Sequence, residues 1–436
     1  MDQLPVELIQ RLLSYLDLNS LRNAALSCRF LFNAFKGAET LITSKILFQH
    51  ISLSVLPEAI LVNKSRSLGE PSISKGLEFA AFLDTREPAP TKWSFANAWP
   101  LVQFHKRVSY LAARFAAEAL EKQPRFLPAG EPDHDEICRF ERAIYRFQLY
   151  CNVVGELFPI TEKELGKMFF DHFATWENEQ LACLYEYFVR LIAKPFNYFV
   201  EHDVAWGYMR VRYIDAHSSP YAQSILLNGI EIVYHLSRAS SYDQIRALLS
   251  RGDDRHDEPF EKETFLYRAL ERGPNPWIPP FVPLSEMNEE DKELVVGDPF
   301  YRDPDPGPAL IWEWIYRDFE PGELVAHMQM RVHRQWAFPF WNSSRLQNAG
   351  LIGDPNIGPV QPTELELEDF NSTDRLNYLE EMRKERVKIY HADGRGHYIY
   401  QDTRQVEWQV SEHQRRIRLA QPQSLEEAKA FLRSVT

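Results

Sequence analysis

The segment Ile137-Cys138-Arg139-Phe140-Glu141-Arg142-Ala143-Ile144-Tyr145-Arg146-Phe147 decides the fold class, because its apolar residues recur at helical spacing. The same stripe continues beyond the segment and holds Ile137, Phe140, Ile144, Phe147, Cys151, Val154 and Phe158. Asp133 and Glu136 precede it at the spacing of a capping box, in which each side chain accepts the other residue's backbone N–H. The pattern predicts a long helix with one buried face.

The segments on both sides of this helix have the same period. Apolar residues step by three and four within 101–115 and again within 181–192. The second of these helices is expected to be interrupted near Pro195, because proline removes a backbone donor. Strand-like alternation is nearly absent, although Tyr398 and Tyr400 hint at a short hairpin. The sequence therefore predicts an all-α fold, an irregular helical bundle or array with long Pro-rich loops and at most a minor β-hairpin near the C-terminus.

The first 35 residues form a second informative stretch. It begins with Leu4-Pro5-Val6-Glu7-Leu8 and closes with Cys28-Arg29-Phe30. Three short helices are predicted, of which the second is capped by Asn19 and the third is stopped by Gly37. A unit of roughly 40 residues is too small to bury so many apolar side chains by itself. A partner surface is therefore implied.

Several ordered features of this stretch resemble the F-box. They are the order Leu-Pro-x-Glu-Leu, a leucine-rich first helix that ends in Tyr15-Leu16, and the Cys28-Arg29 pair, and the match covers residues 4 to about 36. The resemblance implies docking on the Skp-type adaptor of a cullin–RING (SCF) ubiquitin ligase, with a cullin reached through the adaptor. It assigns the adaptor contact to Leu4, Pro5, Leu8, Ile9, Leu12, Leu13, Leu16, Leu21, Cys28, Arg29 and Phe32. The alternative is an ordinary N-terminal helical hairpin that packs on its own domain.

Two later stretches are similar to the carboxy-terminal region of a large group of fungal F-box proteins. One runs from Trp176 to Gly207 and includes Trp176-Glu177-Asn178-Glu179-Gln180-Leu181 and Glu201-His202-Asp203-Val204-Ala205-Trp206-Gly207. The other runs from Arg334-Gln335-Trp336 to Arg345-Leu346. That region carries no activity that can be transferred to this chain. The similarity implies lineage and architecture only.

These patterns divide the chain into five consecutive segments. They are an F-box in 1–45, bridging helices and a connector in 46–97, a helical body in 98–251, a Pro-rich acidic excursion in 252–308, and a C-terminal helical region packed on the body in 309–436. The excursion holds ten of the 28 prolines, and Ser285 to Asp305 carries eight acidic residues against two basic ones. This composition favours an extended, solvent-facing segment, with an acidic docking strip as the alternative.

Three arginines recur on the helix quoted first. Arg139, Arg142 and Arg146 stand at i, i+3 and i+7, roughly opposite the apolar stripe. The simpler interpretation is a solvated face that pairs with neighbours such as Glu141. The alternative is a client-binding face for an acidic or phosphorylated protein, because the guanidinium fork matches phosphate geometry.

Length and composition bound the class of protein. The 436 residues, 44% of them hydrophobic, suffice for two or three domains, and the net charge of −13 disfavours nucleic acid as a partner. No apolar run is long enough to cross a bilayer and no secretory signal is visible, so we expect an intracellular protein of the cytoplasm or nucleus without a membrane partner. The wide spacing of the four cysteines, Cys28, Cys138, Cys151 and Cys183, suits buried thiols better than disulfides or a metal site.

Candidate catalytic groups do not converge in the sequence. Glu201, His202 and Asp203 are adjacent, and neighbouring residues on a helix diverge by about 100°, so a hydrogen-bonded helix end is preferred over a metal site or a general base. The run from His391 to His397 contains two glycines but lacks the flanking strand and helix of a phosphate-binding loop, so we interpret it as a turn. No catalytic residue, cofactor or metal is expected.

The leading hypothesis is therefore a non-catalytic substrate receptor. Its N-terminal helices would dock on the ligase adaptor, and its helical body would present a protein client for ubiquitination by other subunits. The second hypothesis is an adaptor-bound structural or interaction protein that acts outside a ubiquitin ligase. The third, an enzyme with an undetected helical active site, predicts a deep polar pocket with convergent titratable side chains.

Overall fold

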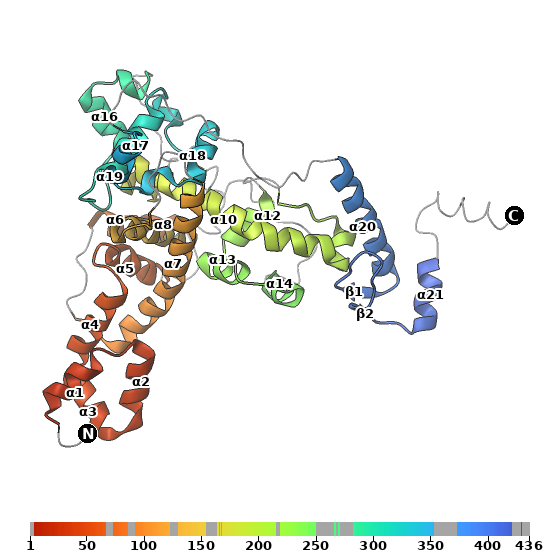
Figure 1. Cartoon of the computed structure of the whole chain (residues 1–436), viewed down its shortest axis with the longest axis horizontal. Helices are drawn as coiled ribbons and strands as arrows, with labels where there is room; N and C mark the ends of the chain where they lie inside the picture. Colours follow the sequence, from red (N-terminus) through yellow and green to blue (C-terminus); the bar gives the residue numbers. More distant parts are fainter. Residues whose placement is uncertain are drawn as a thin grey trace. The chain divides into compact units, whose positions relative to one another are not determined.

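The computed structural model describes residues 4–66, 73–85, 92–122, 130–153, 164, 166, 168–214, 219–249, 266, 269–270, 282–352, 373–420 and 429 (Figure 1). These residues are mostly helical, which confirms the all-α prediction. The helices are α1 (Val6–Leu13), α2 (Leu18–Ser27), α3 (Arg29–Gly37), α4 (Glu39–His50), α5 (Leu56–Ser65), α6 (Ile73–Thr85), α7 (Phe95–Glu121), α8 (His134–Val153), α10 (Thr175–His202), α11 (Val204–Met209), α12 (Pro220–Leu226), α13 (Ile230–Leu236), α14 (Tyr242–Leu249), α16 (Glu289–Val296), α17 (Gly307–Tyr316), α18 (Arg331–Gln335), α19 (Ser343–Asn348), α20 (Thr373–His391) and α21 (Glu412–Ala420). Short 3-10 helices are η2 (Phe170–His172), η4 (Leu284–Glu286), η5 (Pro321–Glu323), η6 (Met328–Met330) and η7 (Phe338–Phe340).

A two-stranded antiparallel sheet is the only sheet within the described ranges. Strand β1 (Gly394–Gly396) pairs with β2 (Val406–Trp408), and Arg395 lies opposite Glu407. The predicted C-terminal hairpin is thus confirmed. Its strands flank Tyr398 and Tyr400 instead of containing them, because these tyrosines lie in the connection between the two strands.

The chain separates into two compact units, each assembled from three stretches of sequence. Unit 1 contains Met1–Phe188, Gln223–Tyr234 and Lys262–Glu364, and unit 2 contains Val189–Ala222, His235–Glu261 and Leu365–Thr436. These boundaries differ from the five consecutive segments expected from composition. Helix α10 contributes its first residues to unit 1 and its last residues to unit 2, so the boundary between the units falls within one helix. The composition of the sequence indicated no boundary at this position.

Helix α8 lies at the centre of unit 1. The predicted capping box forms: the N–H of Glu136 donates to Asp133 Oδ1 at 2.9 Å, and the N–H of Asp133 donates to Glu136 Oε2 at 3.0 Å. Helices α5, α6 and α7 pack against α8, and every side chain from Cys138 to Cys151 is buried. The prediction of a single buried face is therefore wrong, because neighbours cover the helix on all sides. Val154 and Phe158 lie outside the described residues.

Helix α10 continues without a break through Pro195, contrary to the expected interruption. Proline in a helix interior costs about 3 kcal/mol, because it removes one hydrogen bond and crowds the preceding turn. The flanking side chains Ile192 and Phe196 are both buried, and Phe199 and Val200 follow them into the core. Burial of this run offsets the cost of the proline.

The segment before α17 is not a solvent-facing excursion throughout. Helix α16 has no buried residue, as expected for an acidic surface helix. However, Leu284 and Met287 are buried just ahead of it, and the side chain of Asp303 is only 6% exposed. The part of the Pro-rich segment that the structure describes is therefore folded onto unit 1, and two of its acidic residues, Asp303 and Asp305, accept internal hydrogen bonds.

Candidate protein-docking surface

Helix α1 carries two apolar stripes. Ile9 and Leu13, four residues apart, are buried in unit 1. Leu8 and Leu12 occupy the neighbouring positions and are exposed, and Tyr15, three residues after Leu12, is exposed as well. The contrast is sharpest at consecutive residues, because Leu12 is 55% exposed and Leu13 is 3% exposed. Since each residue turns a helix by about 100°, one stripe joins α1 to the rest of unit 1 and the other is uncovered.

Three residues that the F-box resemblance assigns to adaptor contact belong to the core instead. Ile9, Leu13 and Leu21 are buried and form the interior of the three N-terminal helices together with residues of α2 and α3. The side-chain amide of Gln10 donates to the carbonyl of Ala34 at 3.0 Å and ties α1 to α3. The assignment of Ile9, Leu13 and Leu21 to a partner contact is therefore corrected: they hold the helices together.

The other assigned residues reach the surface. Leu4, Pro5, Leu8, Leu12, Cys28, Arg29 and Phe32 are exposed, and Leu16 is half-buried. Exposed apolar side chains that the assignment missed are Val6, Tyr15, Leu26 and Phe30. Tyr15 continues the Leu8–Leu12 stripe, so helical spacing was a usable signal for it. We call the exposed Leu4, Leu8, Leu12, Tyr15, Leu26, Phe30 and Phe32 the N-terminal apolar set.

Local hydrogen bonds position the helices that carry this set. Asp17, rather than the expected Asn19, caps α2, because its carboxylate accepts the N–H groups of Asn19 at 2.9 Å and Ser20 at 3.2 Å. Cys28 has an extended backbone between α2 and α3 and is exposed, whereas the three other cysteines are buried as expected. The cap at Asp17 and the extended backbone at Cys28 thus determine how the three helices are oriented and where their exposed residues point.

The three helices are firmly attached to the body of unit 1. The ring of Phe35, at the end of α3, meets the ring of Phe95 edge to face at 6.1 Å. Glu39, at the start of α4, accepts the backbone N–H of Phe95 at 3.0 Å and pairs with Lys36 at 2.7 Å. Helix α4 packs on α7, so the N-terminal apolar set is carried on a continuous helical support (Figure 1).

The charge of this region differs from that of the whole chain. Residues 4–45 contain five Lys and Arg against three Asp and Glu, whereas the chain has a net charge of −13. The ammonium group of Lys45 lies 3.9 Å from the ring centre of Tyr15. The hydrogen bond from Arg11 and the charge of Lys45 lower the pKa of Tyr15. This segment therefore combines uncovered apolar side chains with a small excess of positive charge, and Arg11 and Lys45 lie beside Tyr15, which suits an apolar partner surface with acidic neighbours.

Arg139 and Arg142 are not available to a client. The guanidinium of Arg139 is completely buried and holds both carboxylate oxygens of Asp303, at 2.7 and 2.9 Å. Arg142 reaches the same carboxylate at 2.8 Å and covers the ring of Tyr301 at 4.2 Å. Burial raises the pKa of Asp303, but the hydrogen bond from Arg139 and the charges of both arginines outweigh it, so the pKa lies below its usual value.

Arg146 has a similar role farther along α8. Its guanidinium donates to Glu177 at 2.5 Å and to Glu58 at 3.3 Å, and all three side chains are buried. The two interpretations of the arginines, a solvated face and a client-binding face, are thus both wrong. The reason is that α8 is enclosed, and internal carboxylates compensate the charges of its enclosed guanidinium groups. The partners Glu58, Glu177 and Asp303 are far from α8 in the sequence, so no local pattern indicated them.

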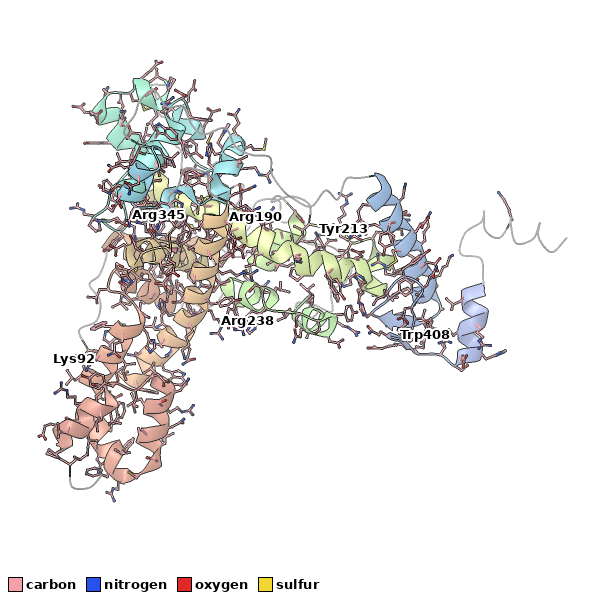
Figure 2. The ribbon with its side chains drawn as sticks, viewed as in Figure 1. Lys92, Arg190, Tyr213, Arg238, Arg345 and Trp408 are labelled. Carbon is pink, nitrogen blue, oxygen red and sulfur yellow. The ribbon has the colours of Figure 1, made fainter. Side chains whose placement is uncertain are left out.

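The residues of the second resemblance form part of the same buried polar network. Arg334 of α18 pairs with Glu179 at 2.6 Å and with Glu186 at 2.7 Å, and both partners lie on α10. These two carboxylates raise the pKa of Arg334 although burial opposes the shift. Arg345, labelled in Figure 2, pairs with Glu136 at 2.7 Å and so joins α19 to the start of α8. The conspicuous polar residues of these stretches are therefore structural.

Glu201, His202 and Asp203 end one helix and begin the next in unit 2, as the sequence predicted. The carboxylate of Asp203 accepts the N–H of Trp206 at 2.9 Å and so caps α11, and it also accepts the hydroxyl of Tyr242. His202 Nδ1 bonds to the carbonyl of Tyr198 at 2.8 Å. The run from His391 to His397 begins at the last residue of α20, turns at Ala392 and Asp393, and continues as β1, so the predicted turn covers only part of the run.

No family model, no curated protein and no solved structure matches the chain. Within the described ranges, none of the helices combines the length and the apolar character that crossing a lipid bilayer requires. The class of protein that the geometry defines is thus a helical protein with a partly uncovered apolar surface on its first three helices.

Proposed function

We propose that this protein is a non-catalytic substrate receptor that docks on the Skp-type adaptor of a cullin–RING ubiquitin ligase through the N-terminal apolar set. The observation that carries the proposal is the uncovered stripe of α1, which is accompanied by exposed apolar side chains on α2 and α3. These residues fall within the stretch that resembles the F-box. Sequence resemblance and surface exposure therefore support the same contact.

The energetics favour a stable partner for this surface. Fully burying one Leu or Phe side chain contributes about 1.5–3 kcal/mol, and several such side chains stand exposed on helices that already have their own small core. Contiguous exposed apolar patches on soluble proteins mark interaction sites. Covering the N-terminal apolar set would supply the apolar centre of an interface, and Arg11 and Lys45 beside Tyr15 would contribute to its rim.

The attachment of the docking helices suits a receptor that holds a client in a defined place. Phe35, Glu39 and Phe95 link α3 and α4 to α7, which runs into the interior of unit 1. A client bound to the body of unit 1 would therefore keep a constant geometry relative to the adaptor. Arg139, Arg142 and Arg146 are excluded from that client contact, because they are buried.

The test is co-purification of the full chain with the adaptor. We expect the wild-type chain to associate and the double variant Leu8→Ala/Leu12→Ala to lose most of the association, because central apolar anchors contribute about 2 kcal/mol or more each. The matched control is Leu53→Ala, whose side chain is 68% exposed but lies between α4 and α5. It should bind as the wild type does.

The outcome separates the hypotheses. If the wild-type chain does not associate under conditions in which an established F-box binds the adaptor, the proposal is wrong. If the adaptor complex forms but excludes a cullin, the protein acts as an adaptor-bound interaction protein outside a ligase. Client proteins that accumulate on the wild-type chain during ligase inhibition, and not on the Leu8→Ala/Leu12→Ala variant, would support the receptor role.

A further inference from the structure

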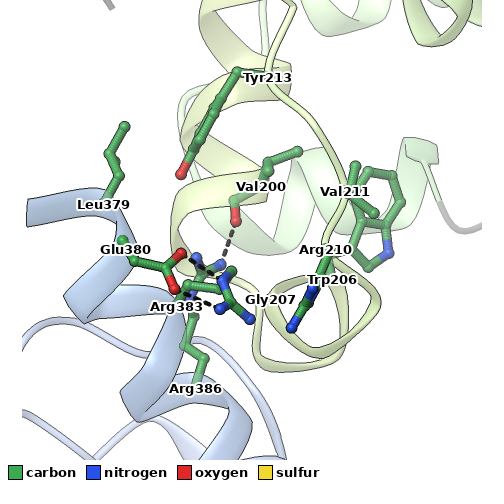
Figure 3. A pocket seen from close by; sticks show the side chains of 10 residues that line it. All are labelled: Val200, Trp206, Gly207, Arg210, Val211, Tyr213, Leu379, Glu380, Arg383 and Arg386. Atoms are coloured by element: carbon green, nitrogen blue, oxygen red, sulfur yellow. Dashed lines mark hydrogen bonds and ion pairs between the residues drawn. The ribbon is translucent and has the colours of Figure 1, made fainter. Parts of the chain in front are cut away.

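Unit 2 contains a small pocket lined by arginines and aromatic side chains (Figure 3). Its volume is about 170 Å³, which is smaller than the roughly 300 Å³ of pockets that take drug-sized ligands. Arg210, Arg383 and Arg386 supply its positive charges, and Glu380 is its one acidic side chain. Three arginines and one glutamate therefore leave the lining with two excess positive charges, whereas the whole chain has a net charge of −13.

Arg386 forms the base of the pocket and is buried to 2% exposure. Its guanidinium donates to the carbonyl of Asp203 at 3.1 Å and to the carbonyl of Val200 near the C-terminal end of α10. These carbonyls accept from one of its terminal nitrogens and do not neutralise its charge. Burial lowers the pKa of Arg386, although Tyr213 and the more distant carboxylates oppose the shift. The charge is thus held in a poorly solvated place without a carboxylate bonded to it in the described residues.

Gly207 allows this guanidinium to lie against α11. A methyl group at Gly207 would stand 2.9 Å from both Cζ and Nε of Arg386, closer than real carbon contacts permit. The absence of a side chain at residue 207 therefore keeps Arg386 in its place beneath the pocket. Any substitution here must displace the guanidinium.

The two other arginines stand at the rim. Arg383 makes a bidentate pair with Glu380, at 2.5 and 2.7 Å, which neutralises one of the three positive charges (Figure 3). Arg210 is exposed and has a left-handed backbone with φ of 58°, which turns the chain at the end of α11. Arg210 and Arg386 are left as the two uncompensated charges of the lining.

The remaining walls are apolar and aromatic. Trp206 and Val211 line one side and Leu379 another, and Figure 3 shows the hydroxyl of Tyr213 directed toward the space beside Glu380 and Arg383. Such a lining favours a compact apolar body attached to a charged group. A phosphate monoester at neutral pH carries between −1.5 and −2 charges, about the excess of the lining, and guanidinium groups match its oxygens.

We propose that this pocket binds a small organic phosphate monoester, whose phosphate lies between Arg210, Arg383 and Arg386 and whose body contacts Trp206 and Tyr213. This inference is independent of adaptor docking. The docking residues lie on α1–α3, and no residue of the pocket belongs to those helices. Binding at this site would make the protein responsive to a small phosphorylated molecule.

The test is calorimetric titration of the full chain with phenyl phosphate, phenyl sulfate and inorganic phosphate at low ionic strength. Phenyl phosphate should bind most tightly, since phenyl sulfate carries only one charge and inorganic phosphate lacks the apolar body. Because the second pKa of a phosphate ester is about 6, the affinity for phenyl phosphate should fall as the pH is lowered from neutral to about 5, while that for phenyl sulfate stays constant.

Substitutions in the pocket test whether phenyl phosphate binds there. Arg210→Gln and Arg383→Gln should each raise the dissociation constant for phenyl phosphate about tenfold, as expected for a lost charge-assisted hydrogen bond. Gly207→Ala should also weaken binding by displacing Arg386. The matched control is Arg212→Gln, an exposed arginine two residues from Arg210 that does not line the pocket and should leave binding unchanged.

Three results would overturn the proposal. They are the absence of phenyl phosphate binding at millimolar concentration, equal affinity for phenyl phosphate and phenyl sulfate at neutral pH, and an Arg212→Gln effect as large as that of Arg210→Gln. The last result would indicate that the ligand is attracted to exposed positive charge in general and not to this pocket. Arg210 and Arg212 are both exposed, so their variants should fold and each outcome can be measured.

Discussion

The first three helices and the α8–α10 region of unit 1 distribute their side chains in opposite ways. Helices α1–α3 leave leucine and phenylalanine side chains in solvent. In the α8–α10 region, by contrast, arginine and glutamate side chains are enclosed, and Arg139, Arg146, Glu177 and Glu179 are all nearly inaccessible. Residue type therefore did not decide burial in either region. The number of neighbouring elements that cover each helix decided it.

The two distributions have different energetic consequences. An enclosed ion pair contributes little net stability compared with apolar residues of the same shape, but it becomes very costly when one partner is lost. An exposed leucine costs the folded chain little and gains free energy only when a partner covers it. The α8–α10 network should therefore control folding, and the N-terminal apolar set should control association.

The largest effect is expected from Arg334→Met, which breaks the enclosed network. The change leaves the carboxylate of Glu179 buried without its arginine and that of Glu186 with only Arg331 at 4.0 Å, so unfolding should become easier by about 3–5 kcal/mol. Urea unfolding followed by tryptophan fluorescence measures it. The control is Arg416→Met, which removes an exposed pair with Glu412 and should change stability by less than about 1 kcal/mol. Equal losses would contradict the contrast between the regions.

The next effect separates two consecutive residues of α1. Leu13→Ala should destabilise the N-terminal helices by about 2–5 kcal/mol, because Leu13 is buried. Leu12→Ala should change stability by less than about 0.5 kcal/mol and instead weaken association with the adaptor. Thermal unfolding and co-purification of both variants give the two readouts. A stability loss at Leu12 as large as at Leu13 would show that the outer stripe is also part of the core.

The enclosed region should also respond to acid through His333. Burial and the neighbouring Arg334 lower the pKa of His333 from 6.5 to about 4. The unfolded chain therefore takes up a proton first, so the stabilisation is complete above pH 6.5 and is lost as the pH falls toward 4. The loss should amount to roughly 3 kcal/mol. His333→Phe should flatten the dependence of unfolding on pH over this window, whereas the exposed His413→Phe should not.

The smallest effect concerns the cap of α2. Asp17→Ala should cost about 1 kcal/mol, because it removes the acceptor for the N–H groups of Asn19 and Ser20. Asn19→Ala should change stability by less than about 0.5 kcal/mol. Circular dichroism during urea unfolding distinguishes them. A larger effect at Asn19 than at Asp17 would restore the cap that sequence reasoning expected.

Much of the helical content was predictable because its signals are local. The capping box of Asp133 and Glu136 and the helix after it depend on residues within a few positions of one another, whereas the hairpin near the C-terminus pairs residues 10 to 14 positions apart. The uninterrupted α10 was not predictable, because packing around Pro195 outweighs the local cost of proline. For the candidate site, the F-box resemblance indicated Leu8 and Leu12 but did not separate them from Ile9 and Leu13.

Three features follow from the sequence alone: the all-α class, the helix that contains Arg139, and an excess of apolar residues in the first 35 positions. The packing of distant elements leaves the outer stripe of α1 uncovered, brings Arg139 to Asp303, and places Arg386 beneath a pocket. The two sets of features depend on contacts between residues at different separations along the chain. A helix forms through contacts three or four residues apart, whereas burial and ion pairing depend on elements that approach from distant parts of the chain.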